Sequence, residues 1–118
     1  MIYILLGTGF EEVEAFAPCD LLRRAGLEVH LVGLNGRRIV GSHKICVEAD
    51  LTIEEAVHVL PELLILPGGL GGVRSILACE AALTFTKRCW DEGKLVAAIC
   101  AAPTVLEKLG IVGEKKAT

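Results

Sequence analysis

Several features that mark particular classes of protein are missing from this 118-residue sequence. It has no cluster of Lys or Arg, and its formal net charge is −3, which argues against a nucleic-acid-binding surface. No apolar run approaches the roughly 20 residues that a membrane-spanning helix needs. The first residues lack the basic region and the long apolar segment of a secretion signal. We therefore expect a cytoplasmic protein whose partners are metabolites or proteins, with no nucleic acid and no membrane among them.

The usual motifs for metals and nucleotides are missing as well. The five cysteines include no CxxC pair and no Cys/His spacing suited to zinc, and the glycine-rich turn lacks both GxGxxG spacing and a Walker lysine. We expect no metal ion and no cofactor. His30 and His43 are interpreted as surface or edge residues. Four cysteines are interpreted as small buried hydrophobic residues, namely Cys19, Cys46, Cys79 and Cys89.

Apolar residues, in contrast, make up 53% of the chain, and the mean hydropathy is +0.56. This is enough for one domain, residues 1–118, with a large core. Apolar runs that predict strands alternate with helical patterns. Asn35-Gly36 is a strong two-residue hairpin signal, and the short segments 37–40 and 44–48 that follow it predict a small antiparallel β-hairpin insertion. The alternation predicts an α/β fold with a doubly wound, mostly parallel sheet, a flavodoxin-like three-layer sandwich. The predicted strands are 1–6, 28–34, 62–66 and 95–99, and the predicted helices are 10–25, 53–57, a long one ending at Glu92, and 104–109.

A reactive cysteine is predicted where the last of these strands ends. The run 95–99 is typical of a strand buried on both faces, and a helical pattern starts shortly after it, so Cys100 lies at a sharp strand-to-helix turn. Such a turn presents its central side chain to solvent, above free backbone N–H groups that favour a thiolate. Cys100 is therefore the one cysteine whose sequence context indicates chemistry.

Acidic residues gather at the start of the first predicted helix. The simplest interpretation of Glu11, Glu12 and Glu14 is a favourable interaction with the helix dipole. In doubly wound sheets, however, ligands bind beyond the carboxyl ends of the strands. That edge should bring together the helix start that carries Glu14, the glycine-rich turn 67–72 and the Cys100 turn.

Three stretches that span nearly the whole chain together resemble the ThiJ/PfpI family, in its branch of Parkinsonism-associated deglycase-like proteins. They are GFEEVEAFAPCDLLRRAG, ELLILPGGLGG and VAAICAAPTVL. The resemblance implies that Cys100 is the reactive cysteine and that Glu14 is its acidic partner. It implies that Gly69 and Ala101 supply backbone N–H donors, and that two copies form a homodimer through the region of 11–25 and 41–46.

The activity that this resemblance implies is a cysteine-dependent, cofactor-independent glyoxalase or protein deglycase acting on methylglyoxal-type dicarbonyls or on glycated proteins. Cys100 would hold the dicarbonyl as a hemithioacetal while a protonated Glu14 relays protons. One alternative is an oxidative-stress sensor or chaperone in which Cys100 is oxidised to the sulfinate. Another is an interaction domain in which Cys100 is merely buried.

Two features depart from the family pattern. Ala101 stands where the protease-like branch has a histidine, which argues against a cysteine peptidase or an amidotransferase. Family members also continue past this chain with a further strand, a covering helix and an active-site histidine, which none of His30, His43 and His58 matches. We therefore expect that the chain lacks its C-terminal portion, either as a fragment or with a companion fragment in a second chain.

Overall fold

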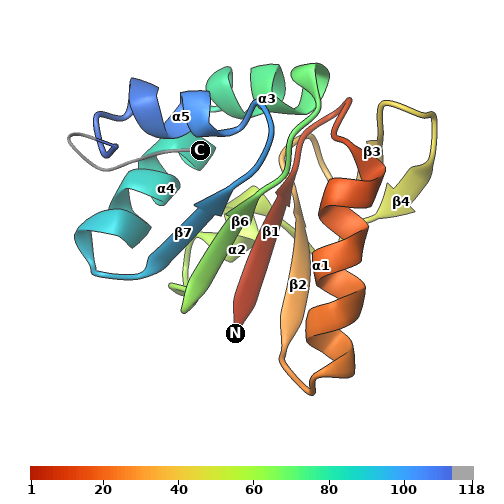
Figure 1. Ribbon diagram of the computed structural model, residues 1–118, viewed down its shortest axis with the longest axis horizontal. Helices are drawn as coiled ribbons and strands as arrows, with labels where there is room; N and C mark the ends of the chain where they lie inside the picture. Colours follow the sequence, from red (N-terminus) through yellow and green to blue (C-terminus); the bar gives the residue numbers. More distant parts are fainter. Residues whose placement is uncertain (113–118) are drawn as a thin grey trace.

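Five parallel strands form the centre of the computed structural model, which describes residues 1–112 (Figure 1). Their order across the sheet is β5-β2-β1-β6-β7, and every neighbouring pair is parallel. All five residues of β1 are buried because the strand is central and both of its faces are covered. The strands are β1 (Ile2–Leu6), β2 (Val29–Gly33), β5 (Leu51–Thr52), β6 (Leu63–Leu66) and β7 (Leu95–Ala98).

Helices cover both faces of this sheet, which confirms the predicted doubly wound α/β fold (Figure 1). One face carries α1 (Glu12–Arg24) and the antiparallel hairpin of β3 (Arg38–Val40) and β4 (Cys46–Glu48). The other face carries α2 (Ile53–Ala56), α3 (Leu70–Leu77), α4 (Glu80–Asp91) and α5 (Pro103–Lys108). Among residues 1–112, no helix has the length and hydropathy needed to cross a bilayer.

The side chains of β1 show how the two cores are separated. Ile2, Ile4 and Leu6 join the core beneath α1, whereas Tyr3 and Leu5 join the core beneath α3 and α4. This follows from the period of two in a strand, which sends successive side chains to opposite faces. The sheet thereby separates a small α1 layer from a larger layer of four helices.

Two sequence signals set helix ends as expected. Gly26 follows α1 with φ +85°, a backbone conformation that glycine adopts without strain. Thr52 begins α2 with a capping box, in which its Oγ1 accepts from the Glu55 N–H at 3.3 Å and the Glu55 carboxylate accepts from the Thr52 N–H at 3.0 Å.

The single long helix predicted to end at Glu92 is wrong, because this segment forms α3 and α4. The chain turns at Ala78 and Cys79, and Cys79 has an extended backbone with φ −104° and ψ 100°. Its side chain makes no capping hydrogen bond. Cysteine is not among the preferred N-cap residues, so no residue type signals the break.

The Asn35-Gly36 turn also plays a different role from the one its sequence indicates. Both edges of β2 are already paired, with β1 and β5, so the strand has no free edge for a hairpin partner. The turn leads into β3, and residues 41–45 join β3 to β4 instead. The Asn35 side chain accepts a hydrogen bond from the Thr8 N–H at 3.3 Å.

Strand β7 is less buried than its composition predicts. Val96 and Ala98 pack against the core of the four-helix layer, but Leu95 is 69% exposed and Ala97 is exposed too. The reason is that β7 is an edge strand, and no element within residues 1–112 covers its second face. The expectation of a strand buried on both faces is therefore wrong for the described part of the chain.

Candidate active site

Three segments meet beyond the carboxyl ends of β1, β6 and β7. The first leads from β1 into α1 and carries Glu14, the second is the glycine-rich turn after β6, and the third is the turn after β7 that holds Cys100 (Figure 1). Parallel strands end at the same edge of a sheet, and so their following loops become neighbours. The structure thus brings together the three segments that the sequence analysis selected.

Gly68, in the glycine-rich turn, contacts both of the other segments. Its N–H donates to Glu14 Oε1 at 2.9 Å, and its carbonyl accepts from the Glu11 N–H at 3.0 Å. A Cβ placed on Gly68 would collide with Glu14 Oε1 and would lie 2.7 Å from Cys100 Cβ. The Glu14 carboxyl and the Cys100 side chain therefore pack against the same Cα atom, and only glycine leaves room for both.

Cys100 occupies a strained turn. Its φ is +61°, which places a residue other than glycine in the left-handed region, and its side chain is exposed. The turn is closed by the Ala102 N–H, which donates to the Ile99 carbonyl at 3.0 Å, and by Thr104 Oγ1, which donates to the Ala101 carbonyl at 2.7 Å. The thiol thus stands at a tight bend, as the sequence predicts.

The two expected N–H donors come from the residue that follows Cys100 and from the residue that follows Gly68. Neither the Gly69 nor the Ala101 N–H donates to an acceptor among residues 1–112. Gly69 has φ +86°, and a Cβ there would lie 2.6 Å from the Glu11 nitrogen, so the position requires glycine. Because α5 has only six residues, any stabilisation of an anion here depends on these individual N–H groups more than on a helix dipole.

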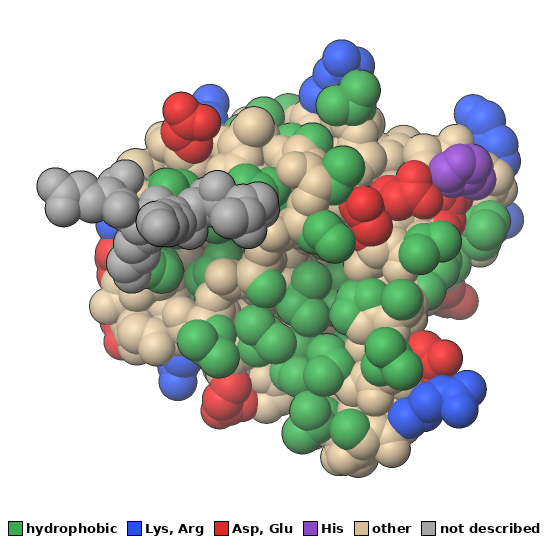
Figure 2. All heavy atoms as spheres, in the orientation of Figure 1, with side chains coloured by type: hydrophobic (Ala, Val, Ile, Leu, Met, Phe, Trp, Pro, Cys, Tyr) green, Lys and Arg blue, Asp and Glu red, His purple; other side chains and the backbone are tan. Residues whose placement is uncertain are grey.

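An apolar groove of about 450 Å³ opens beside Glu14. It runs between α1 and the β7 edge, where Figure 2 shows hydrophobic side chains gathered on the surface. Among residues 1–112, Glu14 is the one ionisable group that lines it. The lining residues are Val13, Glu14, Ala17, Pro18, Leu21, Ile65, Ala97, Ala98 and Ile99.

Glu12 plays a larger role than an interaction with the helix dipole, which corrects the sequence interpretation. Only 4% of it is exposed, and its carboxylate accepts from Ser42 Oγ at 3.1 Å, from the His43 N–H at 2.8 Å and from the Ile45 N–H at 3.4 Å. It also pairs with His43 Nδ1 at 2.9 Å. A periodicity in the sequence could have revealed it, because Glu12 shares the buried stripe of α1 with Ala15 and Cys19.

The electrostatics of this contact follow from its hydrogen bonds. Burial alone would raise the pKa of Glu12, but the hydrogen bonds from the His43 side chain and from the backbone N–H groups lower it to about 2. The same side-chain hydrogen bond, helped by the charges of Glu11 and Glu12, raises the pKa of His43. His43 itself is exposed, as expected from the sequence.

Glu11, Glu12 and His43 are also the residues of the described chain whose atoms are arranged for a metal ion, with ligand atoms within 4.8 Å of one another. Both Glu12 oxygens, however, already accept hydrogen bonds from the loop 42–45. We interpret the cluster as a structural contact between α1 and the hairpin.

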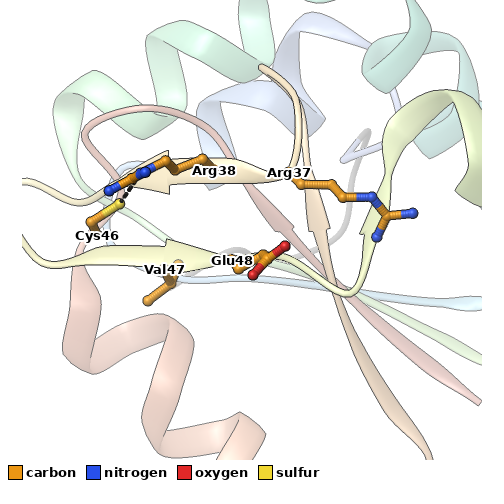
Figure 3. Close-up of a pocket in the computed structure, with 5 residues that line it drawn as sticks. All are labelled: Arg37, Arg38, Cys46, Val47 and Glu48. Carbon is orange, nitrogen blue, oxygen red and sulfur yellow. Dashed lines mark hydrogen bonds between the residues drawn. The ribbon is translucent and has the colours of Figure 1, made fainter.

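A second cavity, of about 430 Å³, lies on the hairpin and is lined by none of the predicted site residues (Figure 3). Within it Arg38 Nε donates to Cys46 Sγ at 3.1 Å. Cys46 is exposed, so its interpretation as a buried hydrophobic residue is wrong, because β4 is half of a two-stranded sheet with one open face. Cys19 and Cys89 are buried as predicted, and Cys79 is half-buried.

Comparison with known proteins gives a consistent result. A sequence profile described as the DJ-1/PfpI family matches residues 1–118, which confirms the resemblance found from the motifs. The protein dj-1beta of Drosophila melanogaster is 36% identical over 98% of this chain and 62% of its own length. Deglycase PfpI of Pyrococcus furiosus is 34% identical over 99% of this chain and 70% of its own length.

Solved structures agree. The structure of oxidised DJ-1 from Toxoplasma gondii superposes with a TM-score of 0.95 at 32% identity, covering 99% of this chain and 65% of that one. The structure of Drosophila melanogaster DJ-1beta superposes with a TM-score of 0.89 at 35% identity, covering 93% and 60%. This chain therefore spans about 60 to 70% of the length of these relatives.

Proposed function

Because this chain belongs to the DJ-1/PfpI family, we propose that it is a cysteine-dependent, cofactor-independent deglycase or glyoxalase acting on methylglyoxal-type dicarbonyls or on their adducts with proteins. The observation that carries the proposal is the packing of Glu14 and Cys100 against the same atom of Gly68. Relatives named as deglycases support the choice of reaction. Cys100 acts as the nucleophile, and Glu14 as the acid and base.

The reaction needs only these groups and water. The Cys100 thiolate adds to the aldehyde carbon of methylglyoxal, and the oxygen takes a proton to give a hemithioacetal. Glu14 then moves a proton from this carbon to its neighbour through an enediol, which leaves a lactate thioester. Water cleaves the C–S bond and releases lactate and the thiol. One water is consumed, and no electron is gained or lost overall.

The backbone geometry supports the charged steps of this sequence. An oxyanion forms when sulfur attacks the aldehyde and again when water attacks the thioester. The Gly69 and Ala101 N–H groups, which have no acceptor within the described residues, are the donors we assign to it. The apolar groove beside Glu14 would receive the methyl end of the substrate.

The test measures lactate formed from methylglyoxal by three variants. Cys100→Ser and Glu14→Gln should each lower kcat by about 100-fold or more, the range for loss of a nucleophile or of a general acid and base. Cys46→Ser is the matched control, since that cysteine is also exposed but lies on the hairpin. Lactate formation by Cys100→Ser at the wild-type rate would refute the proposal.

The exposed thiol at a strained turn supports one alternative, a sensor in which two equivalents of hydrogen peroxide convert Cys100 to the sulfinic acid and give two waters. Mass spectrometry after mild peroxide treatment tests it. Gain of two oxygens on Cys100, with Cys46 spared, supports sensing, whereas equal oxidation of both cysteines argues against it.

We further propose a homodimer formed through α1 and the hairpin. Val13 and Leu21 on α1 are 70% and 65% exposed, which is high for large apolar side chains on one helix and supports an interface there. A cytoplasmic location remains a prediction from the sequence.

A further inference from the structure

We propose that Glu12 is a positioning residue for Glu14: by binding the hairpin loop 41–45 it fixes the rotation of the first turn of α1, and so holds the Glu14 carboxyl against Gly68 and Cys100. The inference deepens the proposed function, because it assumes that Glu14 acts on Cys100. It gives the two glutamates of the same turn separate roles. Glu12 anchors the helix, and Glu14 performs the chemistry.

The geometry of α1 separates the two side chains. Residues two apart on a helix point about 200° from each other around its axis. Glu12 accordingly faces the hairpin loop, while Glu14 faces the turn after β6, where its Oε1 accepts from the Gly68 N–H at 2.9 Å. A rotation of the first turn that releases one carboxylate therefore also moves the other.

The contact of Glu12 with the hairpin loop is close and specific. Its carboxylate is bound by Ser42, by the backbone and ring nitrogens of His43 and, at 3.4 Å, by the Ile45 N–H. A Cβ on Gly41 would lie 2.8 Å from Glu12 Cγ and would collide with the carboxylate, so the loop approaches the side chain as closely as glycine allows. A charge buried in this way resists displacement, since leaving it without these donors is costly.

Backbone hydrogen bonds connect the same loop to the segment before α1. The Gly9 N–H donates to the Val40 carbonyl at 2.9 Å, and the Ser42 N–H donates to the Phe10 carbonyl at 2.8 Å. On the other side, the Glu11 N–H donates to the Gly68 carbonyl at 3.0 Å. The start of α1 is therefore held between the hairpin loop and the glycine-rich turn, and Glu12 is its side-chain anchor on the hairpin side.

The experiment is a double-mutant cycle that does not require dicarbonyl turnover. The rate of iodoacetamide alkylation at Cys100 is followed from pH 5 to 9 by peptide mass, with Cys46 read separately, in the wild type, Glu12→Gln, Glu14→Gln and the double variant. Glu12→Gln should change the Cys100 rate in the same direction as Glu14→Gln, by about threefold, and should add nothing in the Glu14→Gln background. Asp20→Asn is the matched control and should leave the rate unchanged, because this carboxylate is on the same helix but is exposed and pairs with Arg24 at 2.9 Å.

Additive effects in the double variant, or an unchanged rate in folded Glu12→Gln, would overturn the proposal. If Glu12→Gln does not fold, as judged by circular dichroism, the variant His43→Ala replaces it. This removes a donor from the loop side while leaving α1 intact, and its effect should disappear in the Glu14→Gln background. If the Glu12 and Glu14 variants have non-additive effects on the alkylation rate but the wild type forms no lactate from methylglyoxal, the proposed function alone is refuted. If lactate forms but the two effects are additive, the role of Glu12 alone is refuted.

Discussion

At the scale of single residues, the candidate site depends on a position with no side chain. Gly68→Ala places a methyl group against Glu14 Oε1 and 2.7 Å from Cys100 Cβ. The Gly68 carbonyl accepts a hydrogen bond from the Glu11 N–H, which holds the backbone in place, so the two side chains must move. We therefore expect Gly68→Ala to lower the free energy of unfolding by about 1–3 kcal/mol. The alkylation rate of Cys100 should change with it. Urea denaturation and peptide mass measure the two effects.

Gly93→Ala is the control for this prediction. Gly93 has φ +77°, yet a Cβ there would meet nothing within 4 Å, so the substitution introduces backbone strain without a clash. Gly93→Ala should lower the free energy of unfolding by about 1 kcal/mol and leave the alkylation rate of Cys100 unchanged. An equal change of the Cys100 rate in both variants would contradict the assignment of Gly68 to the site.

The pair of Glu12 and His43 should make the stability of the fold depend on pH. The pKa of His43 is raised, so its contribution to stability is fully present below its ordinary value of 6.5 and is lost as pH rises through the folded value. The pKa of Glu12 is lowered to about 2, so its contribution is present above 4.5 and is lost as pH falls toward 2. The pair therefore stabilises most between pH 4.5 and 6.5.

Replacement of the ring tests this dependence. In His43→Asn the melting temperature should fall less between pH 6 and 9 than in the wild type, as measured by differential scanning fluorimetry. An equal fall in melting temperature between pH 6 and 9 in the two proteins would show that His43 does not cause the pH dependence.

Some residues of the site could be predicted from the sequence, and the pairing of Glu12 with His43 could not. Cys100 could be selected because the end of an apolar run and a following helical pattern are local signals. Glu12 and His43 could not be paired, because their contact joins residues that are 31 positions apart and depends on how the hairpin folds over α1. Cys46 was misjudged for a related reason, since its exposure follows from the open face of a two-stranded sheet.

At the scale of elements, α1 contains an unusual proline. Pro18 is the seventh of its thirteen residues, where it has no N–H to donate to the carbonyl of Glu14. The helix nevertheless continues from Glu12 to Arg24. Pro18→Ala restores this donor, and we expect it to raise the free energy of unfolding by about 2 kcal/mol. This net gain allows for the greater flexibility of the unfolded chain once the proline is removed, which acts in the opposite direction.

Pro103 provides the matched comparison. It stands at the start of α5, where an N–H would have no partner within the helix in any case. Pro103→Ala should therefore change stability by less than about 0.5 kcal/mol in the same urea titration. A gain in Pro103→Ala equal to that of Pro18→Ala would contradict the explanation by a missing hydrogen bond.

Most elements could be predicted because their signals are local. The four long strands, α1, the hairpin strands and the Thr52 cap all follow from apolar runs, helical spacing and terminal residues. The break between α3 and α4 could not, since it occurs at Ala78 and Cys79, which carry no turn signal. The burial of β7 was overestimated because composition reports how apolar a strand is and not which neighbours cover it.

At the scale of the whole molecule, an apolar face lies open between α1 and β7 in the part of the chain that the structure describes (Figure 2). Leu21 on α1 and Leu95 on β7 have nearly equal exposure, 65% and 69%. The proposed homodimer uses α1 and the hairpin, so it would cover Leu21 and leave Leu95 exposed. The two leucines therefore make a matched pair of sites for a test of the interface.

Leu21→Asp should weaken self-association by about tenfold or more, since burial of a leucine contributes about 1.5–3 kcal/mol and a buried unpaired carboxylate costs more. Leu95→Asp should leave the dissociation constant unchanged, as measured by sedimentation velocity over a range of concentrations. Both changes introduce one carboxylate at an exposed leucine, so general charge repulsion would act on them alike. An equal loss of association in both variants would place the contact on the β7 edge or on the whole apolar face. A selective loss in Leu21→Asp would place it on α1, the helix that carries both Glu12 and Glu14, and would link the dimer directly to the geometry of the site.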